Sequence, residues 1–170
     1  MTTSPLQQAL ARAPERTTEA LSRPEVELFC FSAGELALAF PAAHVREVVR
    51  LSAVTPLPRA PQFLRGVCGH RGEVLPVFDL LRYLGHGETR SLQRARLVVG
   101  VFERFVAGFL AEDVAGLRTV ERAALQQAPV GADRAAEHLE SVFRQADGSS
   151  LHVLDLPRLL QTLHARVVRR

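Results

Sequence analysis

The chain has 170 residues, a formal net charge of +3 and a hydrophobic fraction of 47%. This length suits one domain or two small lobes and allows a sizeable core. The 21 basic residues, all arginine, are interleaved with 18 acidic ones, which argues against a nucleic-acid-binding face. There is no apolar run of the roughly 20 residues that cross a membrane and no signal-peptide pattern after Met1, so the sequence predicts a cytoplasmic protein.

Residues 1–24 predict a flexible N-terminal extension, because three prolines and only three leucines leave little to bury. From residue 25 the apolar side chains recur at every second position, which is typical of strands. Residues 25–30 and 36–40 alternate in this way around a turn at 32–35, so they predict a β-hairpin.

The middle of the first half continues this pattern. Residues 45–51 are β-branched enough for another strand, and the prolines of 55–61 predict a stiff connector across the surface. Residues 65–78 predict a second hairpin, in which three glycines allow a sharp turn or a close backbone approach. Asp79 then suits the cap of a short helix that Gly85 would end.

The second half begins with residues 97–110, which predict another apolar hairpin. Residues 111–128 fit a helix as well as a strand. Residues 142–154 predict a third hairpin through an Asp-Gly turn. Asp155 caps a final helix with its leucines on one face, and residues 166–170 form a basic tail that suits the C-terminal end of a helix.

The two halves of the chain echo each other. Residues 40–45 align with 109–114, and residues 75–80 align with 151–156. This repeat favours a strand over a helix after Val114. Five short strands per half are typical of a small barrel, so the sequence predicts a mostly β fold of two barrels with a shared seam.

The residues that carry catalytic or metal chemistry are sparse. Cys30 and Cys68 lie in apolar stretches, where free thiols behave as small core residues. Cys68, His70 and His86 make at most a poor metal site, because a metal needs three or four converging ligands. A small β-barrel enzyme or metal-dependent hydrolase would need such a converging set. An RNA-binding module would need exposed aromatic side chains on a basic face, and aromatics make up only 6% of the chain.

Arg71 lies between His70 and Gly72 at the tip of the glycine-rich hairpin. A guanidinium there can make bidentate contacts with carboxylates or backbone oxygens of a partner. It can equally tie the hairpin to the connector or to Asp79 within the same chain. The residues alone leave both interpretations open.

Several motifs, in a specific order and spacing, resemble the CheW family of chemotaxis adaptors. They are FPAAHVREV at residues 40–48, TPLP at 55–58 with Pro61, Gly66-Val67, and RGEVLPVFDL at 71–80. The second half matches more loosely, at residues 108–114 and 151–160. The resemblance covers about residues 25–165.

The resemblance implies two five-stranded SH3-like β-barrels packed side by side, with a C-terminal α-helix. The CheW-like domain would span residues 25–165, with lobes at about 25–90 and 91–165. It also implies a non-enzymatic scaffold without a cofactor, which couples the cytoplasmic tip of a chemoreceptor to the regulatory domain of a CheA-type histidine kinase. Such a protein would be cytoplasmic and recruited to membrane-associated receptor arrays.

In this family the receptor contacts the groove between the barrels. Val45 and Val48 would be the apolar anchors there, and Arg71 would be a polar clamp. The residues that match positions around the groove are Val45, Glu47, Val48, Gly66, Arg71 and Gly72. The sequence departs from the family pattern where Gly69-His70 replaces the usual Asn-Leu. The alternative function is a CheW-like module with a divergent partner, in a chemosensory pathway for surface motility or development.

Overall fold

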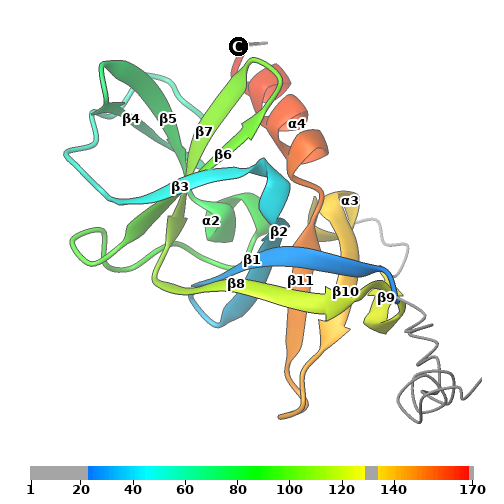
Figure 1. Cartoon of the computed structure of the whole chain (residues 1–170). Helices are drawn as coiled ribbons and strands as arrows, with labels where there is room; N and C mark the ends of the chain where they lie inside the picture. Colours follow the sequence, from blue (N-terminus) through cyan, green and yellow to red (C-terminus); the bar gives the residue numbers. More distant parts are fainter. Residues whose placement is uncertain (1–22, 129–133, 169–170) are drawn as a thin grey trace, which may run out of the picture.

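The structure is a computed structural model that describes residues 23–128 and 134–168, and it is mostly β (Figure 1). Its first sheet has six strands in the spatial order β8 (Asp113–Glu121), β1 (Glu25–Ala33), β2 (Leu36–Pro41), β11 (Ser150–Leu154), β10 (Leu139–Arg144) and β9 (Leu125–Gln127). Its second sheet has five strands in the order β3 (Val45–Arg50), β6 (Arg96–Phe102), β7 (Phe105–Ala111), β5 (Glu73–Phe78) and β4 (Leu64–His70). The helices are α2 (Leu80–Leu84), α3 (Arg134–His138) and α4 (Leu156–Val168), with 3-10 turns η1 (Ala42–His44) and η2 (Arg122–Ala124).

These elements confirm the predicted hairpins, the strand after Val114 and the final helix. The short helix α3 was not predicted. The flexible extension was predicted at residues 1–24, of which 1–22 lie outside the described residues. The predicted basic tail begins inside α4, because the helix continues to Val168, and Arg169 and Arg170 lie outside the described residues. No helix within the described ranges is long and apolar enough to cross a membrane.

Strands from the two predicted lobes, residues 25–90 and 91–165, pair with each other in both sheets, and the lobe boundaries stay a prediction. Strand β11 of the second half pairs in parallel with β2 of the first, and β5 of the first half pairs in parallel with β7 of the second. Each sheet therefore contains strands from both halves. A sequence repeat shows which strands of the two halves are equivalent. It does not show which strands pair in a sheet, because a parallel pair can join segments far apart in the chain.

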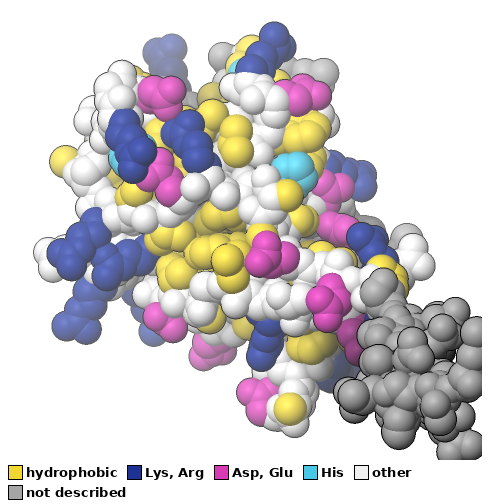
Figure 2. Space-filling view, viewed as in Figure 1, with side chains coloured by type: hydrophobic (Ala, Val, Ile, Leu, Met, Phe, Trp, Pro, Cys, Tyr) yellow, Lys and Arg dark blue, Asp and Glu magenta, His cyan; other side chains and the backbone are white. Residues whose placement is uncertain are grey.

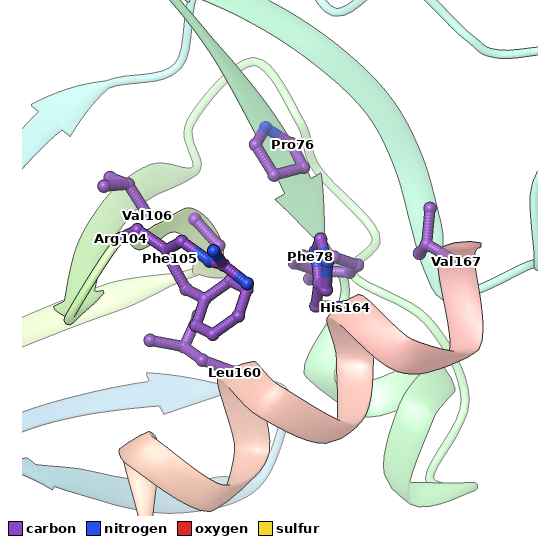
Figure 3. A pocket seen from close by; sticks show the side chains of 9 residues that line it. Pro76, Phe78, Arg104, Phe105, Val106, Leu160, His164 and Val167 are labelled. Carbon is purple, nitrogen blue, oxygen red and sulfur yellow. The ribbon is translucent and has the colours of Figure 1, made fainter. Parts of the chain in front are cut away.

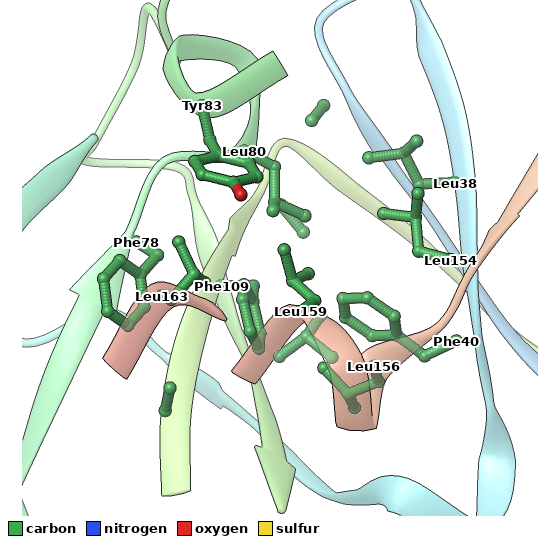
Figure 4. Packing of buried hydrophobic residues seen from close by; sticks show 14 of the residues in the cluster. Leu38, Phe40, Phe78, Leu80, Tyr83, Phe109, Leu154, Leu156, Leu159 and Leu163 are labelled. Atoms are coloured by element: carbon green, nitrogen blue, oxygen red, sulfur yellow. The ribbon is translucent and has the colours of Figure 1, made fainter. Parts of the chain in front are cut away.

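The main core lies between the two sheets and α4 (Figure 4). Phe40 of β2 and Phe109 of β7, which occupy equivalent places in the repeat, meet there with ring centroids 5.1 Å apart. The predicted apolar face of α4 is buried against them through Leu156, Leu159 and Leu163. Smaller clusters fill each sheet separately, and the free thiols of Cys30 and Cys68 are buried in them, as predicted.

The two aspartates before helices have different roles. Asp155 caps α4, because its Oδ1 accepts a hydrogen bond of 3.0 Å from the backbone N–H of Arg158. Asp79 precedes α2, which ends at Gly85 as predicted, but its side chain makes no capping hydrogen bond. Its carboxylate is fully buried and accepts hydrogen bonds from the backbone N–H and the hydroxyl of Thr89, at 3.0 and 3.1 Å. Asp79 therefore anchors the loop that leads from α2 to β6.

A buried polar pair joins the helices. The hydroxyl of Tyr83 on α2 lies 2.7 Å from Nε2 of His138 on α3. Arg166 of α4 lies over the Tyr83 ring, with its Cζ 5.3 Å from the ring centroid. The three helices thus meet at one side chain, Tyr83, whose surface is entirely buried.

Candidate partner-binding surface

The second sheet has two edge strands, β3 and β4, which do not pair through their backbones. Contacts between their side chains connect them instead. Nε2 of His70 on β4 donates a hydrogen bond of 3.0 Å to Oε1 of Glu47 on β3. Nη2 of Arg71 lies 3.0 Å from the other carboxylate oxygen of Glu47. A second ion pair connects Nη2 of Arg46 to Oε2 of Glu73 at 3.1 Å. Together these side chains close the gap between β3 and the β4–β5 hairpin.

The turn of this hairpin presents Arg71 to solvent. His70 and Glu73 form the last pair of the ladder, so Arg71 and Gly72 make a two-residue loop. Both have positive φ angles, 49° and 81°, which is the conformation that two-residue hairpins favour and that glycine adopts without strain. The Arg71 side chain remains 74% exposed while its guanidinium reaches Glu47. The structure therefore contains an internal tie for Arg71, to Glu47 rather than to the connector or Asp79.

The carboxylate of Glu47 is held in its ionised form. The hydrogen bond from His70 is the main reason that the pKa of Glu47 lies below its ordinary value. Partial burial opposes this shift, and the positive charges of Arg71 and Arg46 add to it. The edge of the sheet therefore carries an ionised carboxylate, that of Glu47, beside His70 and two exposed arginines, Arg46 and Arg71.

Gly66 allows a close approach between β4 and the connector. The backbone N–H of Thr55 donates to the carbonyl of Val67 at 2.8 Å, and the N–H of Val67 donates to the carbonyl of Thr55 at 2.9 Å. Gly66 has a φ of 142°, and a Cβ atom there would lie 2.2 Å from the Thr55 carbonyl oxygen. Gly66 is buried beneath the connector, where it shapes the surface, and its place in the partner site stays a prediction.

Next to this edge lies an apolar area between the two sheets. Val45 and Val48 of β3, Phe29 of β1 and Val114 of β8 are partly buried and pack against the main core. Leu117 of β8 is opposite Phe29 in the ladder and is 64% exposed. Figure 2 shows hydrophobic side chains gathered between β3 and the β1–β8 pair. We call these five residues the inter-sheet surface.

The six predicted site residues thus fall into separate roles. Val45 and Val48 belong to the inter-sheet surface, and Glu47 and Arg71 form an ion pair at its edge. Gly66 and Gly72 shape the connector and the turn. The prediction missed the contact of His70 with Glu47. It also missed the contributions from β1 and β8, because no local spacing connects residues so far apart in the chain.

The poor metal set suggested by the sequence does not come together. Cys68 is buried in the core of the second sheet, His70 bonds to Glu47, and His86 is exposed in the loop after α2. No group of three or more metal-ligating side chains converges anywhere in residues 23–128 and 134–168.

A separate apolar pocket of about 250 Å³ lies between α4 and the strands β5 and β7 (Figure 3). Pro76 and Phe78 of β5, Phe105 at the start of β7, and Leu160 and His164 of α4 line it. The ring centroids of Phe105 and His164 lie 4.7 Å apart. None of the six predicted site residues lines this pocket, so it is distinct from the inter-sheet surface.

Comparisons with known proteins agree with this architecture. A CheW-like domain model matches residues 27–164. The chain is 50% identical over 160 residues to protein FrzA of Myxococcus xanthus, covering 93% of this chain and 99% of FrzA. It is 26% identical over 139 residues to the chemotaxis protein CheW of Thermotoga maritima, covering 82% and 90% of the two chains. The solved structure of the scaffolding protein TtCheW from Thermoanaerobacter tengcongensis has a TM-score of 0.70 and 21% identity, covering 78% of this chain and 86% of that one. The likeness to TtCheW supports the predicted fold of two SH3-like barrels, with one sheet of six strands rather than five.

Proposed function

The chain belongs to the CheW-like family, and from this membership we propose that it is a non-enzymatic chemosensory adaptor that couples a chemoreceptor to a CheA-type histidine kinase. The observation that carries the proposal is the position of the inter-sheet surface beside the Glu47–Arg71 ion pair. Partly buried aliphatic side chains bordered by exposed polar groups are the usual anatomy of a protein-binding surface. Val45 and Val48 would be the apolar anchors for the receptor tip, and Arg71 the polar contact.

An adaptor must hold two partners at once, so it needs two surfaces. The pocket between α4, β5 and β7 is an apolar area separate from the inter-sheet surface. We assign the regulatory domain of the kinase to this pocket and the receptor tip to the inter-sheet surface. Recruitment to membrane-associated receptor arrays would follow from the receptor contact.

The proposal is tested first with Arg71→Glu, measured as affinity for a purified chemoreceptor tip fragment and, separately, for the kinase regulatory domain. Arg71 is paired with Glu47, so this variant also places two carboxylates together. The double variant Glu47→Gln/Arg71→Glu removes the carboxylate repulsion, keeps an acceptor for the hydrogen bond from His70, and gives the new carboxylate an amide donor. If Arg71 contacts the receptor, the double variant remains defective; if Arg71 only fixes the hairpin, receptor binding returns.

Arg144→Glu is the matched control, because Arg144 is an exposed arginine on β10 of the other sheet. We expect Arg71→Glu to weaken receptor binding at least about tenfold, the loss usual for a desolvated charged contact, while kinase binding and the control are unchanged. Wild-type protein that binds neither partner would refute the adaptor function.

One observation favours the alternative function with a divergent receptor. His70 stands where the family usually has leucine, and its ring is hydrogen-bonded to Glu47 at the edge of the proposed receptor surface. The test compares tip fragments of receptors from flagellar and from surface-motility gene clusters. Gly69→Asn/His70→Leu restores the family pair, and a shift of preference toward the flagellar receptor would support the divergent role.

A further inference from the structure

Three arginines gather at the end of β3, away from the Glu47–Arg71 pair. Arg50, Arg94 and Arg96 line a pocket of about 480 Å³ that also contains Gln93 and Leu51. None of the three arginines forms an ion pair with any acidic group in the part of the chain that the structure describes. The cluster therefore concentrates positive charge without a counter-charge among the described residues.

The strand register makes this arrangement unfavourable in the free protein. Arg50 of β3 is directly opposite Arg96 of β6, so both side chains leave the same face of the sheet. Like charges directly opposite each other in an antiparallel pair destabilise the sheet. An anion bound between them would remove this repulsion, and guanidinium groups are suited to bidentate contacts with carboxylates.

The position of the cluster indicates what kind of anion it meets. Val48 is paired with Val98, and the next pair on the same face is Arg50 with Arg96, one repeat of about 7 Å farther along the strands. The cluster is thus the continuation of the inter-sheet surface. Figure 2 shows arginine side chains gathered at the left of the view, beside the hydrophobic side chains between the sheets.

We propose that Arg50, Arg94 and Arg96 bind the carboxylates of an acidic stretch in the partner segment that occupies the inter-sheet surface. This inference rests on the proposed function, since the segment would be the chemoreceptor tip. A helix rises about 5.4 Å per turn, so an acidic side chain one to two turns from an apolar anchor on Val48 reaches the cluster. Carboxylates of a protein segment fit better than a free phosphate, because a single chain can occupy both areas.

The experiment uses the full chain and the variant Arg50→Gln/Arg96→Gln. Arg122→Gln/Arg144→Gln is the matched control, since it removes two exposed charges from the first-sheet side of the molecule. Affinity for a receptor tip fragment is measured at low and high salt. We expect a loss of about tenfold in the cluster variant and little change in the control. The difference should disappear when the acidic residues of the tip are replaced by glutamine.

Equal affinities of the cluster and control variants for the tip would overturn the inference and leave the adaptor function intact. A tip that binds neither protein would instead refute the proposed function. In that case hexaglutamate and hexaglutamine peptides test the cluster directly, through the side-chain Nε–H signals of Arg50 and Arg96 in NMR spectra. Shifts with hexaglutamate alone support carboxylate binding. No shift, or stronger binding of inorganic phosphate, anionic vesicles or nucleic acid, overturns it.

Discussion

Gly66 lies so close to Thr55 that a Cβ atom on the glycine would stand 2.2 Å from the Thr55 carbonyl oxygen. The two backbone hydrogen bonds between Thr55 and Val67 span this contact and hold the connector against β4. A glycine at this position of the family motif is therefore explained by packing of the backbone. It sets the shape of the surface beside the proposed receptor contact.

We predict that Gly66→Ala destabilises the protein by at least about 1–3 kcal/mol, because the backbone strain at a positive φ adds to the clash with Thr55. Gly69→Ala is the control on the same strand, since no atom outside its two chain neighbours lies within 4 Å of its Cβ position. Urea unfolding gives the free energy of unfolding of both variants. Equal stabilities would mean that the connector moves away from β4 at little cost.

The hydrogen bond between His70 and Glu47 predicts a titration behaviour. His70→Leu, which has no hydrogen-bond donor, should raise the pKa of Glu47 toward its ordinary value, and Arg71→Ala should raise it less, because the hydrogen bond from His70 is the larger cause. Carbon-detected NMR of the side-chain carboxyl groups follows this titration. Asp147 serves as an internal reference, because its low pKa depends on Ser149 and should not respond to either change. A larger response to Arg71→Ala would reverse the assigned order.

The buried pair of Tyr83 and His138 predicts an acid-sensitive stability. Burial lowers the pKa of His138 below the ordinary value of 6.5, so the folded protein binds fewer protons than the unfolded chain below that pH. The contribution of His138 to the free energy of unfolding should therefore be fully present above pH 6.5, and the free energy should decrease as the pH falls below this value. Denaturant unfolding over this range measures the slope.

His138→Gln removes the titrating group and should flatten this part of the slope, although the variant itself is less stable. His86→Gln is the control, because it removes an exposed histidine that is not part of the buried pair of Tyr83 and His138. An unchanged slope in His138→Gln would place the acid sensitivity elsewhere in the molecule.

The two aspartates before helices should differ in what their removal disturbs. Asp79→Ala leaves the Thr89 N–H and hydroxyl buried without their acceptor, which costs roughly 1–3 kcal/mol. Asp155→Ala removes one capping hydrogen bond, which costs about 1 kcal/mol. Hydrogen exchange distinguishes them: protection should fall in residues 85–95 for Asp79→Ala and in the first turn of α4 for Asp155→Ala. Loss of protection in α2 of Asp79→Ala would instead show that Asp79 caps this helix.

Strands and the final helix could be predicted because their causes are local. Alternating apolar side chains mark β1 and β2, and the spacing of Leu156, Leu159 and Leu163 marks the buried face of α4. The sheet assignment could not be predicted in this way. Whether β5 and β11 pair within their own half or across to the other depends on the packing of residues far apart in the chain.

The candidate site divides along the same line. The resemblance to the family named Glu47 and Arg71 but not their contact, because residues 47 and 71 share no local period. The departure from the family pattern at Gly69-His70 marks the position of His70, but it does not predict the hydrogen bond to Glu47. The arginine cluster was missed because Arg50 and Arg96 become neighbours only through the register of β3 and β6.

The pairing of strands between the two halves affects how this protein folds and whether it can be cut into stable fragments. His152 on β11 meets the backbone carbonyl of Ala37 on β2, residues 115 positions apart in the chain. With such distant partners in both sheets, the first sheet cannot be completed until nearly all of the chain has been synthesised, which predicts slow, all-or-none folding. Proteolysis between the halves, in the loop of residues 85–95, would therefore leave two fragments that each lack neighbours for some of their strands.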